Sequence, residues 1–297
     1  MTLVNEEGVV FAEIEDYAIK RVHQMDLGVN KAKNASFYYG LDWIEKEINL
    51  TDESSKDMGT VLIFKDETSI GDQMRQAFDS MDRPWIQVEW GAEFEELDQR
   101  SYKINGLQSD YMTLIGLLKE RGITQIVHLL SVVEKQDVND LLDLEETQKR
   151  GYESLVRLTK ALLEHNIHDE IEILLVAPYV YELNEQQEYI QPHHATLFGL
   201  GKVVTQEYPH LLCRAIDIDK WTTAETILAE LGSKDKDYLV MHRKDQRFVE
   251  EFCEWNLDDI ADDSIEIREN GVYLLTGGLG AIGLEMAHYL ASQASVN

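Results

Sequence analysis

Residues 271–283 of this 297-residue chain read GVYLLTGGLGAIG, and this stretch says most about the fold. Its apolar first half, Gly271–Thr276, predicts a buried strand, and the glycines that follow are spaced as Gly278-x-Gly280-x-x-Gly283. A helical pattern comes next, with its apolar positions at Leu284, Ala287, Leu290 and Ala291. The sequence therefore predicts a strand, a tight glycine turn and an amphipathic helix.

Each glycine of this turn has a physical role. Gly278 and Gly280 permit a tight turn and let the backbone come close to a pyrophosphate, and Gly283 lets the helix pack closely on the strand. The first N–H groups of the helix then face phosphate oxygens at the positive end of the helix dipole. We therefore predict nucleotide binding here, and the alternative is a tight βα turn without a ligand.

Upstream, from about residue 59, short apolar runs alternate with longer helical patterns. The predicted strands are Thr60–Phe64, Trp85–Trp90, Gln125–Val132, Ile171–Pro178, Leu212–Ile218 and Tyr238–His242. The predicted helices are Thr68–Met81, Leu107–Arg121, Glu145–His165, His193–Tyr208 and Thr222–Gly232. Within the third helix, Leu155, Leu158 and Leu162 form one buried stripe. This alternation predicts a mostly parallel α/β sheet.

The first turn of this region differs from the glycine-rich one. After the strand that ends at Phe64, the chain lacks closely spaced glycines and carries Asp66 and Glu67 where a phosphate would lie. We therefore expect the large region to have a Rossmann-like alternation of strands and helices, to bind no dinucleotide and to act as a scaffold.

Composition excludes several classes of function. The chain has 27 basic and 56 acidic residues and a formal net charge of −29, so we expect no binding to nucleic acid or to an anionic membrane. Its apolar runs, such as Ile173–Pro178, fall far short of the ~20 residues that a membrane helix needs, and the N-terminus has no signal-peptide pattern. Cys213 and Cys253 form no CxxC pair, which favours neither disulfides nor zinc. We expect a cytoplasmic protein.

A search for catalytic residues finds no complete set. No tyrosine has a lysine four residues later, and the nearest match is Tyr17 with Arg21. Three further groups are interpreted as structural: His193-His194 as first-turn residues of a helix, Asp217 and Asp219 as a polar strand end, and Phe37-Tyr38-Tyr39 with Trp43 as packing.

Three stretches together resemble a known family. They are Tyr39–Trp43, the run Leu197–Pro209 followed by Cys213–Asp219, and Gly271–Gly283. Over residues 37–297 the chain resembles the ketoreductase region of a bacterial modular polyketide synthase. In that family a truncated, non-catalytic Rossmann-like structural subdomain precedes a catalytic short-chain-dehydrogenase subdomain.

The resemblance implies a domain organisation. Residues 1–36 are similar to the end of a dehydratase domain with a linker, residues 37–267 to the structural subdomain, and residues 268–297 to the start of the NADPH-binding catalytic subdomain. The expected fold class is α/β, with a mostly parallel Rossmann-like sheet followed by the first βα unit of a second, true Rossmann fold. The implied cofactor-binding residues are Thr276, Gly277, Gly278, Leu279, Gly280, Ala281, Ile282 and Gly283.

The resemblance also implies an activity. A ketoreductase uses NADPH to reduce the β-keto group of an acyl thioester held on the phosphopantetheine of an acyl carrier protein, beside other synthase domains of a multifunctional enzyme of antibiotic biosynthesis. The family's NADPH-selecting arginine, its serine and its proton-donating tyrosine would lie beyond Asn297. We therefore expect residues 1–297 alone to bind NADPH weakly or not at all and to lack reductase activity.

Two alternatives stay open. The chain could be a non-catalytic reductase-like scaffold or interaction module within a polyketide synthase, whereas a self-contained dehydrogenase would need a full Rossmann half after Gly283. Carrier proteins are generally acidic, so a docking patch on this chain must be locally basic. Arg243-Lys244 and Arg247 are the candidates, and the alternatives are a plain solvated turn or a patch outside this chain.

Overall fold

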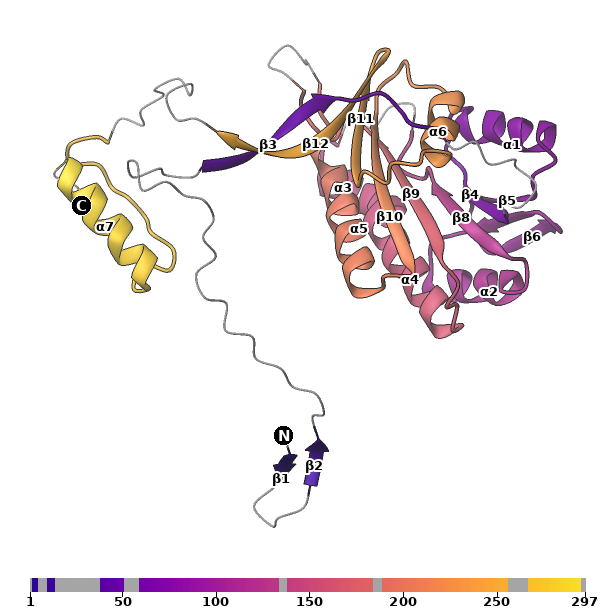
Figure 1. Cartoon of the computed structure of the whole chain (residues 1–297), viewed down its shortest axis with the longest axis horizontal. Coiled ribbons are helices and arrows are strands. Elements are labelled where there is room, and N and C mark those ends of the chain that lie inside the picture. Colours follow the sequence, from indigo (N-terminus) through magenta and orange to yellow (C-terminus); the bar gives the residue numbers. More distant parts are fainter. Residues whose placement is uncertain are drawn as a thin grey trace. The chain divides into compact units, whose positions relative to one another are not determined.

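The computed structural model of the chain describes residues 2–4, 10–13, 38–50, 59–133, 138–183, 189–255 and 267–294. Two compact units divide the chain (Figure 1). One is Gly40–Cys253, and the other combines Met1–Tyr39 with Glu254–Asn297. Each unit is described by itself below.

A ten-stranded sheet has the order β3-β12-β11-β10-β9-β8-β4-β5-β7-β6 (Figure 1). The strands are β3 (Tyr38–Glu45), β4 (Thr60–Phe64), β5 (Trp85–Trp90), β6 (Glu95–Asp98), β7 (Ser101–Ile104), β8 (Ile123–His128), β9 (Ile171–Pro178), β10 (Leu211–Ile218), β11 (Leu239–Arg243) and β12 (Gln246–Trp255). The seven strands from β7 to β11 pair in parallel, whereas β6 and β12 run antiparallel to their neighbours β7 and β11. If β4 is counted as strand 1, the parallel strands β7-β5-β4-β8-β9-β10 follow the Rossmann order 3-2-1-4-5-6, and β11 adds a seventh strand beside β10.

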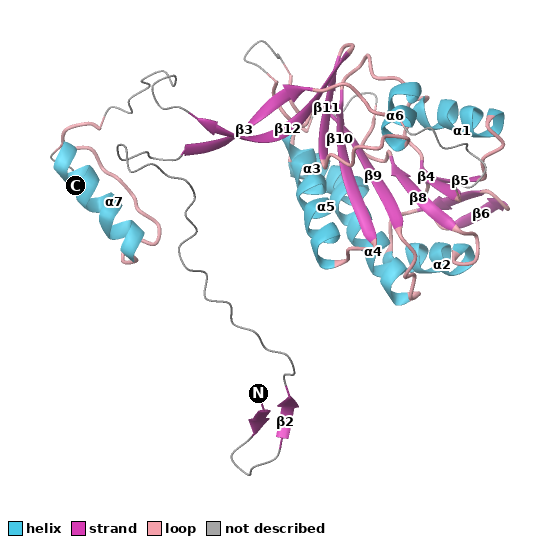
Figure 2. Cartoon of the chain, in the orientation of Figure 1, coloured by secondary structure: helices cyan, strands magenta, loops and turns pink. Residues whose placement is uncertain are grey.

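Helices cover both faces of this sheet (Figure 2). They are α1 (Ile70–Ser80), α2 (Gln108–Leu118), α3 (Leu141–Gln148), a π-helical turn (Lys149–Glu153), α4 (Ser154–Glu164), a 3₁₀ turn (Pro192–His194), α5 (Ala195–Glu207) and α6 (Ala224–Leu231). Because strand side chains alternate between faces, Leu62 and Phe64 pack with α2, α4 and α5, whereas Val61 and Ile63 pack with α1 and α6. Two apolar cores result, one on each side of the sheet.

The predicted α/β alternation is confirmed, with differences at some ends. The predicted strand Gln125–Val132 begins at Ile123 and ends at His128, and the predicted helix Glu145–His165 is continuous with α3 through the π-helical turn. The stripe of Leu155, Leu158 and Leu162 is buried as predicted. The sequence analysis did not predict β6, β7 or β12, which end or border the sheet.

The prediction of a strand at Gly271–Thr276 is wrong. These residues are irregular, and Val272 and Leu274 are 84% and 91% exposed. A parallel strand satisfies its backbone groups only through neighbouring strands, and none of the described strands pairs with this segment. The helix that follows is present as α7, Ala281–Gln293, although its apolar stripe buries no side chain.

A charged cluster is buried where β10, β11, β12 and α6 meet. The Glu230 carboxylate is fully buried and lies 3.0 Å from Nη2 of Arg214, 2.9 Å from Nε2 of His242 and 2.6 Å from Nε of Arg247. Burial opposes ionisation of Glu230, but hydrogen bonds from His242 and Arg247 outweigh it and lower the pKa of Glu230 to about 2. The cluster therefore keeps its charges compensated inside the protein.

The N-terminal region contributes one described feature, an antiparallel pair of β1 (Thr2–Val4) and β2 (Val10–Glu13). This pair does not identify a domain, so the dehydratase assignment of residues 1–36 stays a prediction, and most of that range, with Tyr17 and Arg21, lies outside the described residues. Among the helices described, none has the length and apolarity needed to cross a bilayer.

Candidate functional site

The glycine-rich turn before α7 is closed by its own backbone. Gly277 has a φ of 71°, a conformation that side chains other than glycine adopt at a cost. The N–H of Gly280 donates to the carbonyl of Gly277 over 2.9 Å, and the N–H of Leu284 donates to the carbonyl of Gly280 over 2.9 Å. The tight turn thus depends on Gly277 for its backbone conformation, with Gly278 and Gly280 completing it.

Gly283 has no space for a side chain. A Cβ atom there would lie 2.4 Å from the carbonyl oxygen of Gly277 and 2.6 Å from Cα of Gly278. The close approach expected at Gly283 is therefore present, but its partner is the turn itself and not a strand. This approach holds the turn directly over the first residues of α7.

The N-terminus of α7 is open to an anion. Its cap residue, Gly280, supplies no side-chain hydrogen bond to the first N–H groups. Ala281 follows as the first helical residue, and the side chains of Leu279 and Ile282 are 94% and 82% exposed. Free N–H groups at a glycine-rich helix start are suited to a dinucleotide pyrophosphate, so Thr276–Gly283 fit the cofactor predicted for them.

The corresponding turn before α1 is already filled. The Asp66 carboxylate accepts a hydrogen bond from N–H of Gly71 over 2.7 Å and another from N–H of Ile70 over 3.2 Å. Asp66 is 6% exposed, so this carboxylate takes the place of an anion inside the turn. A phosphate would have to displace it, which gives a physical reason for the prediction that the large sheet binds no dinucleotide.

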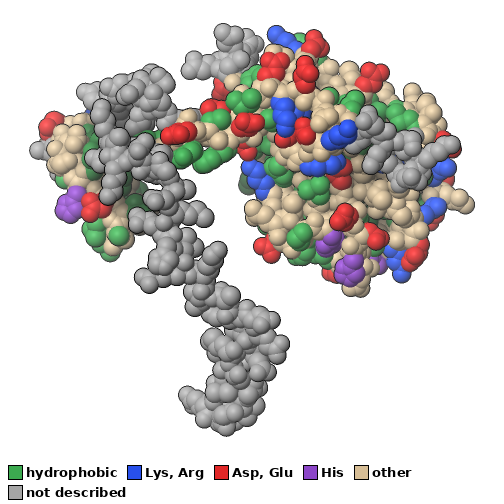
Figure 3. All heavy atoms as spheres, viewed as in Figure 1, with side chains coloured by type: hydrophobic (Ala, Val, Ile, Leu, Met, Phe, Trp, Pro, Cys, Tyr) green, Lys and Arg blue, Asp and Glu red, His purple; other side chains and the backbone are tan. Residues whose placement is uncertain are grey.

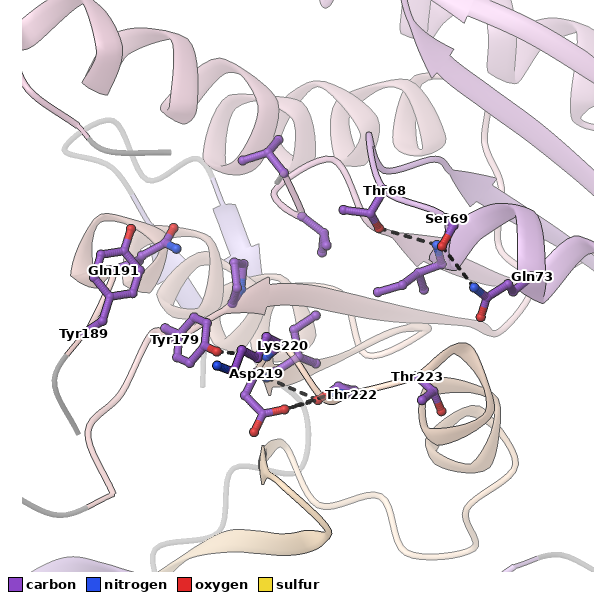
Figure 4. Close-up of a pocket in the computed structure, with 15 residues that line it drawn as sticks. Thr68, Ser69, Gln73, Tyr179, Tyr189, Gln191, Asp219, Lys220, Thr222 and Thr223 are labelled. Carbon is purple, nitrogen blue, oxygen red and sulfur yellow. Dashed lines mark hydrogen bonds between the residues drawn. The ribbon is translucent and has the colours of Figure 1, made fainter. Parts of the chain in front are cut away.

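A cavity of about 610 Å³ lies at the carboxyl edge of the sheet (Figure 4). We call it the switch-point cavity, because the strand order reverses between β4 and β8 at this edge. Thr68 follows β4, and Tyr179 and Asp219 follow β9 and β10. The rings of Tyr179 and Tyr189 meet edge to face at 5.8 Å. The position is that of a Rossmann ligand site.

The polar groups of the switch-point cavity bond to one another. Asp219 accepts from N–H of Trp221 and of Thr222, each over 3.0 Å, and the Tyr179 hydroxyl accepts from N–H of Lys220 over 2.9 Å. No group of three or more metal-ligating side chains occurs in the part of the chain that the structure describes. Asp219 and the Tyr179 hydroxyl thus hold the loop after β10 in place from the wall of the cavity.

Several residues of the other groups interpreted as structural have structural partners, although the buried Nε2 of His193 has none among the described residues. Asp217 is buried and accepts from N–H of Val180 and Tyr181, and its carboxylate pairs with Arg243 over 2.8 Å. His194 lies in the turn before α5, with Nε2 3.1 Å from Oε1 of Gln191. The ring of Trp43 packs 5.8 Å from that of Tyr181, whereas Tyr38 and Tyr39 are about half exposed and Phe37 lies outside the described residues.

The sequence analysis missed a buried trio of Tyr111, Ser154 and His128. The Tyr111 hydroxyl donates to Oγ of Ser154 over 2.6 Å, and Nε2 of His128 lies 2.8 Å from the same oxygen. All three side chains are fully buried, which excludes a substrate, and burial lowers the pKa of His128 to about 4. The trio therefore links strand β8 to α2 and α4 inside the core.

Of the three candidate residues for a basic docking patch, two are buried and paired, which favours the alternative of a plain turn. Arg243 pairs with Asp217, and Arg247 pairs with Glu230 and with Asp237, and both arginines are less than 10% exposed. Lys244 alone is exposed, in the turn between β11 and β12. On the face drawn in Figure 3, acidic and basic side chains are interspersed over this unit. The turn is thus a solvated one and not a basic surface.

Comparison with known proteins agrees with these observations. Residues 59–235 match the family described as beta-ketoacyl synthase-like, N-terminal. Polyketide synthase PksN of Bacillus subtilis is 31% identical over 101 residues, which are 33% of this chain and 2% of PksN. Polyketide synthase PksM of the same organism is 27% identical over 145 residues, 48% of this chain and 3% of PksM. The chain therefore spans a few per cent of the length of these relatives.

Solved structures share the fold. A keto acid-selecting NRPS module with adenylation, ketoreductase and pseudo-Asub domains aligns with a TM-score of 0.76 at 23% identity, covering 92% of this chain and 23% of that one. An N-terminal ketoreductase from the macrolactin assembly line aligns with a TM-score of 0.68 at 21% identity, covering 87% of this chain and 52% of that one. With polyketide synthases as its sequence relatives and ketoreductases as its structural ones, the chain belongs to the beta-ketoacyl synthase-like, N-terminal family and has the fold of a ketoreductase region of a modular polyketide synthase.

Proposed function

We propose that this chain is part of a ketoreductase that reduces the β-keto group of a carrier-bound acyl thioester with NADPH. Residues 37–267 form the structural subdomain, and residues 268–297 begin the cofactor-binding subdomain. The observation that carries this proposal is the closed glycine turn over the uncapped N-terminus of α7, in a chain whose fold is that of ketoreductases.

NADPH would supply the hydride. The N–H groups at the start of α7 would bind its pyrophosphate, because they lack side-chain acceptors and lie at the positive end of the helix dipole. The absence of side chains at Gly277 and Gly283 keeps the turn closed, which fixes these N–H groups in one direction. Residues 276–283 would therefore bind and orient the cofactor, and none of their side chains is proposed to transfer a proton.

The proposed partners are an acyl carrier protein with its phosphopantetheine-bound β-ketoacyl chain and the neighbouring synthase domains. The −29 net charge repels an acidic carrier, and the described residues offer no basic patch at Arg243–Arg247. Carrier contacts are therefore proposed outside this turn.

A graft tests the cofactor site. Residues 271–293 would replace the corresponding βα segment of an active modular ketoreductase, and NADPH oxidation would be measured with a β-keto thioester. We expect activity with a KM for NADPH close to that of the parent, and a rise of about tenfold or more in Gly283→Val, whose side chain would collide with the Gly277 carbonyl.

The matched control is Gln293→Val in the same graft, which introduces the same side chain at the exposed C-terminal end of α7, away from the turn. Thermal unfolding of every variant separates loss of cofactor binding from loss of folding. A folded graft that oxidises no NADPH would overturn the proposal and favour the alternative, a non-catalytic scaffold or interaction module.

A further inference from the structure

A second cavity, of about 500 Å³, lies at the opposite edge of the sheet, where the parallel strands begin. We call it the amino-edge cavity. Its wall includes Arg83 just before β5, Gln125 on β8, Glu170 and Glu172 at the start of β9, His210 before β10 and Lys236 before β11. It is separate from the switch-point cavity and from the glycine-rich turn.

Arg83 is an unusual arginine. Four arginines among the described residues are less than 10% exposed, and three of them, Arg214, Arg243 and Arg247, pair with buried carboxylates. Arg83, which is 6% exposed, has no described carboxylate within 4.0 Å. Its Nη2 donates to the neutral amide oxygen of Gln125, and its Nε has no partner among the described residues.

A buried cation without a counter-ion is costly. Removing the partner of a buried ion pair strongly destabilises a protein, because the remaining charge is left uncompensated. The ring of Phe78, 5.3 Å from the Arg83 guanidinium carbon, compensates only part of this. Burial lowers the pKa of Arg83 and the more distant Glu172 carboxylate partly offsets this, and arginine stays protonated in proteins. Arg83 therefore borders the cavity without a directly paired carboxylate, although Glu170 and Glu172 also line it.

Two further donors border the same cavity. Nε2 of His210 is buried and has no partner among the described residues, and Lys236 lies at the rim with its side chain 39% exposed. The nearest buried carboxylate, Glu172, already accepts from Lys236 over 2.9 Å, from Arg214 over 3.2 Å and from Gln125 over 2.8 Å. Glu172 thus forms its direct ion pairs with other groups and attracts Arg83 only from beyond 4.0 Å, across the Gln125 amide.

We propose that the amino-edge cavity binds a phosphate group, with the Arg83 guanidinium as its main ligand and His210 and Lys236 as additional donors. A planar guanidinium presents parallel N–H groups that match phosphate oxygens, and charge-assisted hydrogen bonds of this kind are roughly twice as strong as neutral ones. Glu170, exposed at the rim, and Glu172 in the wall oppose the anion and limit its affinity.

The test is a ³¹P NMR titration of inorganic phosphate with the full chain at constant ionic strength. We expect saturable binding by the unmodified chain and a loss of about tenfold or more in affinity for Arg83→Met. Lys160→Met, which removes a cation from an exposed position of α4, is the matched control and keeps the affinity unchanged. Glu170→Gln removes one opposing charge and strengthens binding several-fold.

Urea unfolding in phosphate-free buffer accompanies each titration. Arg83→Met is expected to be at least as stable as the unmodified chain, because it removes a buried charge that has no directly paired carboxylate. If that variant fails to fold, Arg83→Lys keeps the charge, loses the planar fork and should still bind phosphate more weakly. Equal affinities of Arg83→Met and Lys160→Met, no saturable binding by the unmodified chain, or binding of acetate in preference to phosphate would each overturn the proposal.

Discussion

The turns before α1 and before α7 differ in what bonds to the first N–H groups of the helix. Both begin a helix whose first N–H groups need acceptors. Before α1 the acceptor is the chain's own Asp66, whereas before α7 glycines close the turn and leave the N–H groups uncapped. The start of a helix in a βα unit can therefore have its N–H groups bonded by the chain itself, or it can leave them available to an external anion. In this chain the presence or absence of one carboxylate, Asp66 in the α1 turn, makes the difference.

The surroundings of the two turns differ as well. The α1 turn follows β4, whose five residues are all buried between two helix layers. The α7 turn follows residues 271–276, whose apolar side chains are largely exposed, and α7 itself buries no side chain. The first turn is thus supported by a complete core, and the second depends on backbone contacts within the turn.

Hydrogen exchange should show the largest contrast. Amides of the fully buried strand β9 are expected to exchange at least about 1,000-fold more slowly than those of residues 271–276, because β9 opens only with the whole unit. Mass-spectrometric exchange on the intact chain measures both peptides in one experiment. Strong protection of residues 271–276 would mean that they are paired in a strand after all.

Acidification should destabilise the large unit, Gly40–Cys253, which contains the α1 turn. Burial lowers the pKa of His128 from 6.5 to about 4 and that of His194 to about 3. Since both folded pKa values lie below the unfolded one, stability is full above pH 6.5 and falls as the pH drops from 6.5 toward 4, by about 3 kcal/mol for His128.

Urea unfolding between pH 7.5 and 4.5 measures this dependence. His128→Gln keeps a polar partner for Ser154 but cannot titrate, so the loss of stability on acidification should shrink in that variant. A free energy of unfolding that stays constant from pH 6.5 to 4.5 would contradict the assignment of His128 as a buried neutral histidine.

Asp66→Ala tests the difference between the turns directly. Loss of this acceptor leaves N–H of Ile70 and of Gly71 without their bonds and should lower the free energy of unfolding by about 1–2 kcal/mol. Asp72→Ala is the control, since its carboxylate, also in the first turn of α1, forms partly exposed pairs with Lys65 and Arg75 and should cost under about 0.5 kcal/mol. Equal losses in the two variants would show that Asp66 is not an internal anion.

Gly277→Ala is expected to have the smallest effect. A side chain in the left-handed region costs about 1 kcal/mol, so α7 amides should exchange roughly fivefold faster. Gly199→Ala, in the middle of α5 with open space around it, should instead stabilise by about 0.5–1 kcal/mol. If Gly277→Ala left exchange in α7 unchanged, the turn would not depend on this backbone conformation.

Apolar runs and glycine spacing predicted most of the sheet and both turns. Strands such as β4 and β9 were predictable because uninterrupted Val, Ile and Leu runs suit a strand covered on both faces. Strand β6 was not, because its four exposed residues, Glu95–Asp98, carry no apolar pattern and form a strand only by pairing with β7. The failure at Gly271–Thr276 has the same origin, since a strand needs neighbours that local sequence does not contain.

Charged residues were harder to predict. Arg243 and Arg247 suggested a basic surface because charges are usually exposed, but partners distant in sequence, Asp217 and Glu230, compensate them inside the fold. Arg83 gave no signal at all, because its burial depends on how β5, β8 and β9 are arranged. Sequence spacing alone cannot reveal such pairings.

The buried cluster around Glu230 has a consequence for how this protein can evolve. One carboxylate there contacts Arg214, His242 and Arg247, so replacing it removes a buried partner from all three at once and leaves the two arginines with only Glu172 and Asp237. A single substitution at Glu230 is therefore expected to be deleterious in any background that retains its partners. Substitutions at Glu230 and its partners should be tolerated only when they occur together. We therefore expect these residues to change together during evolution or to stay as they are.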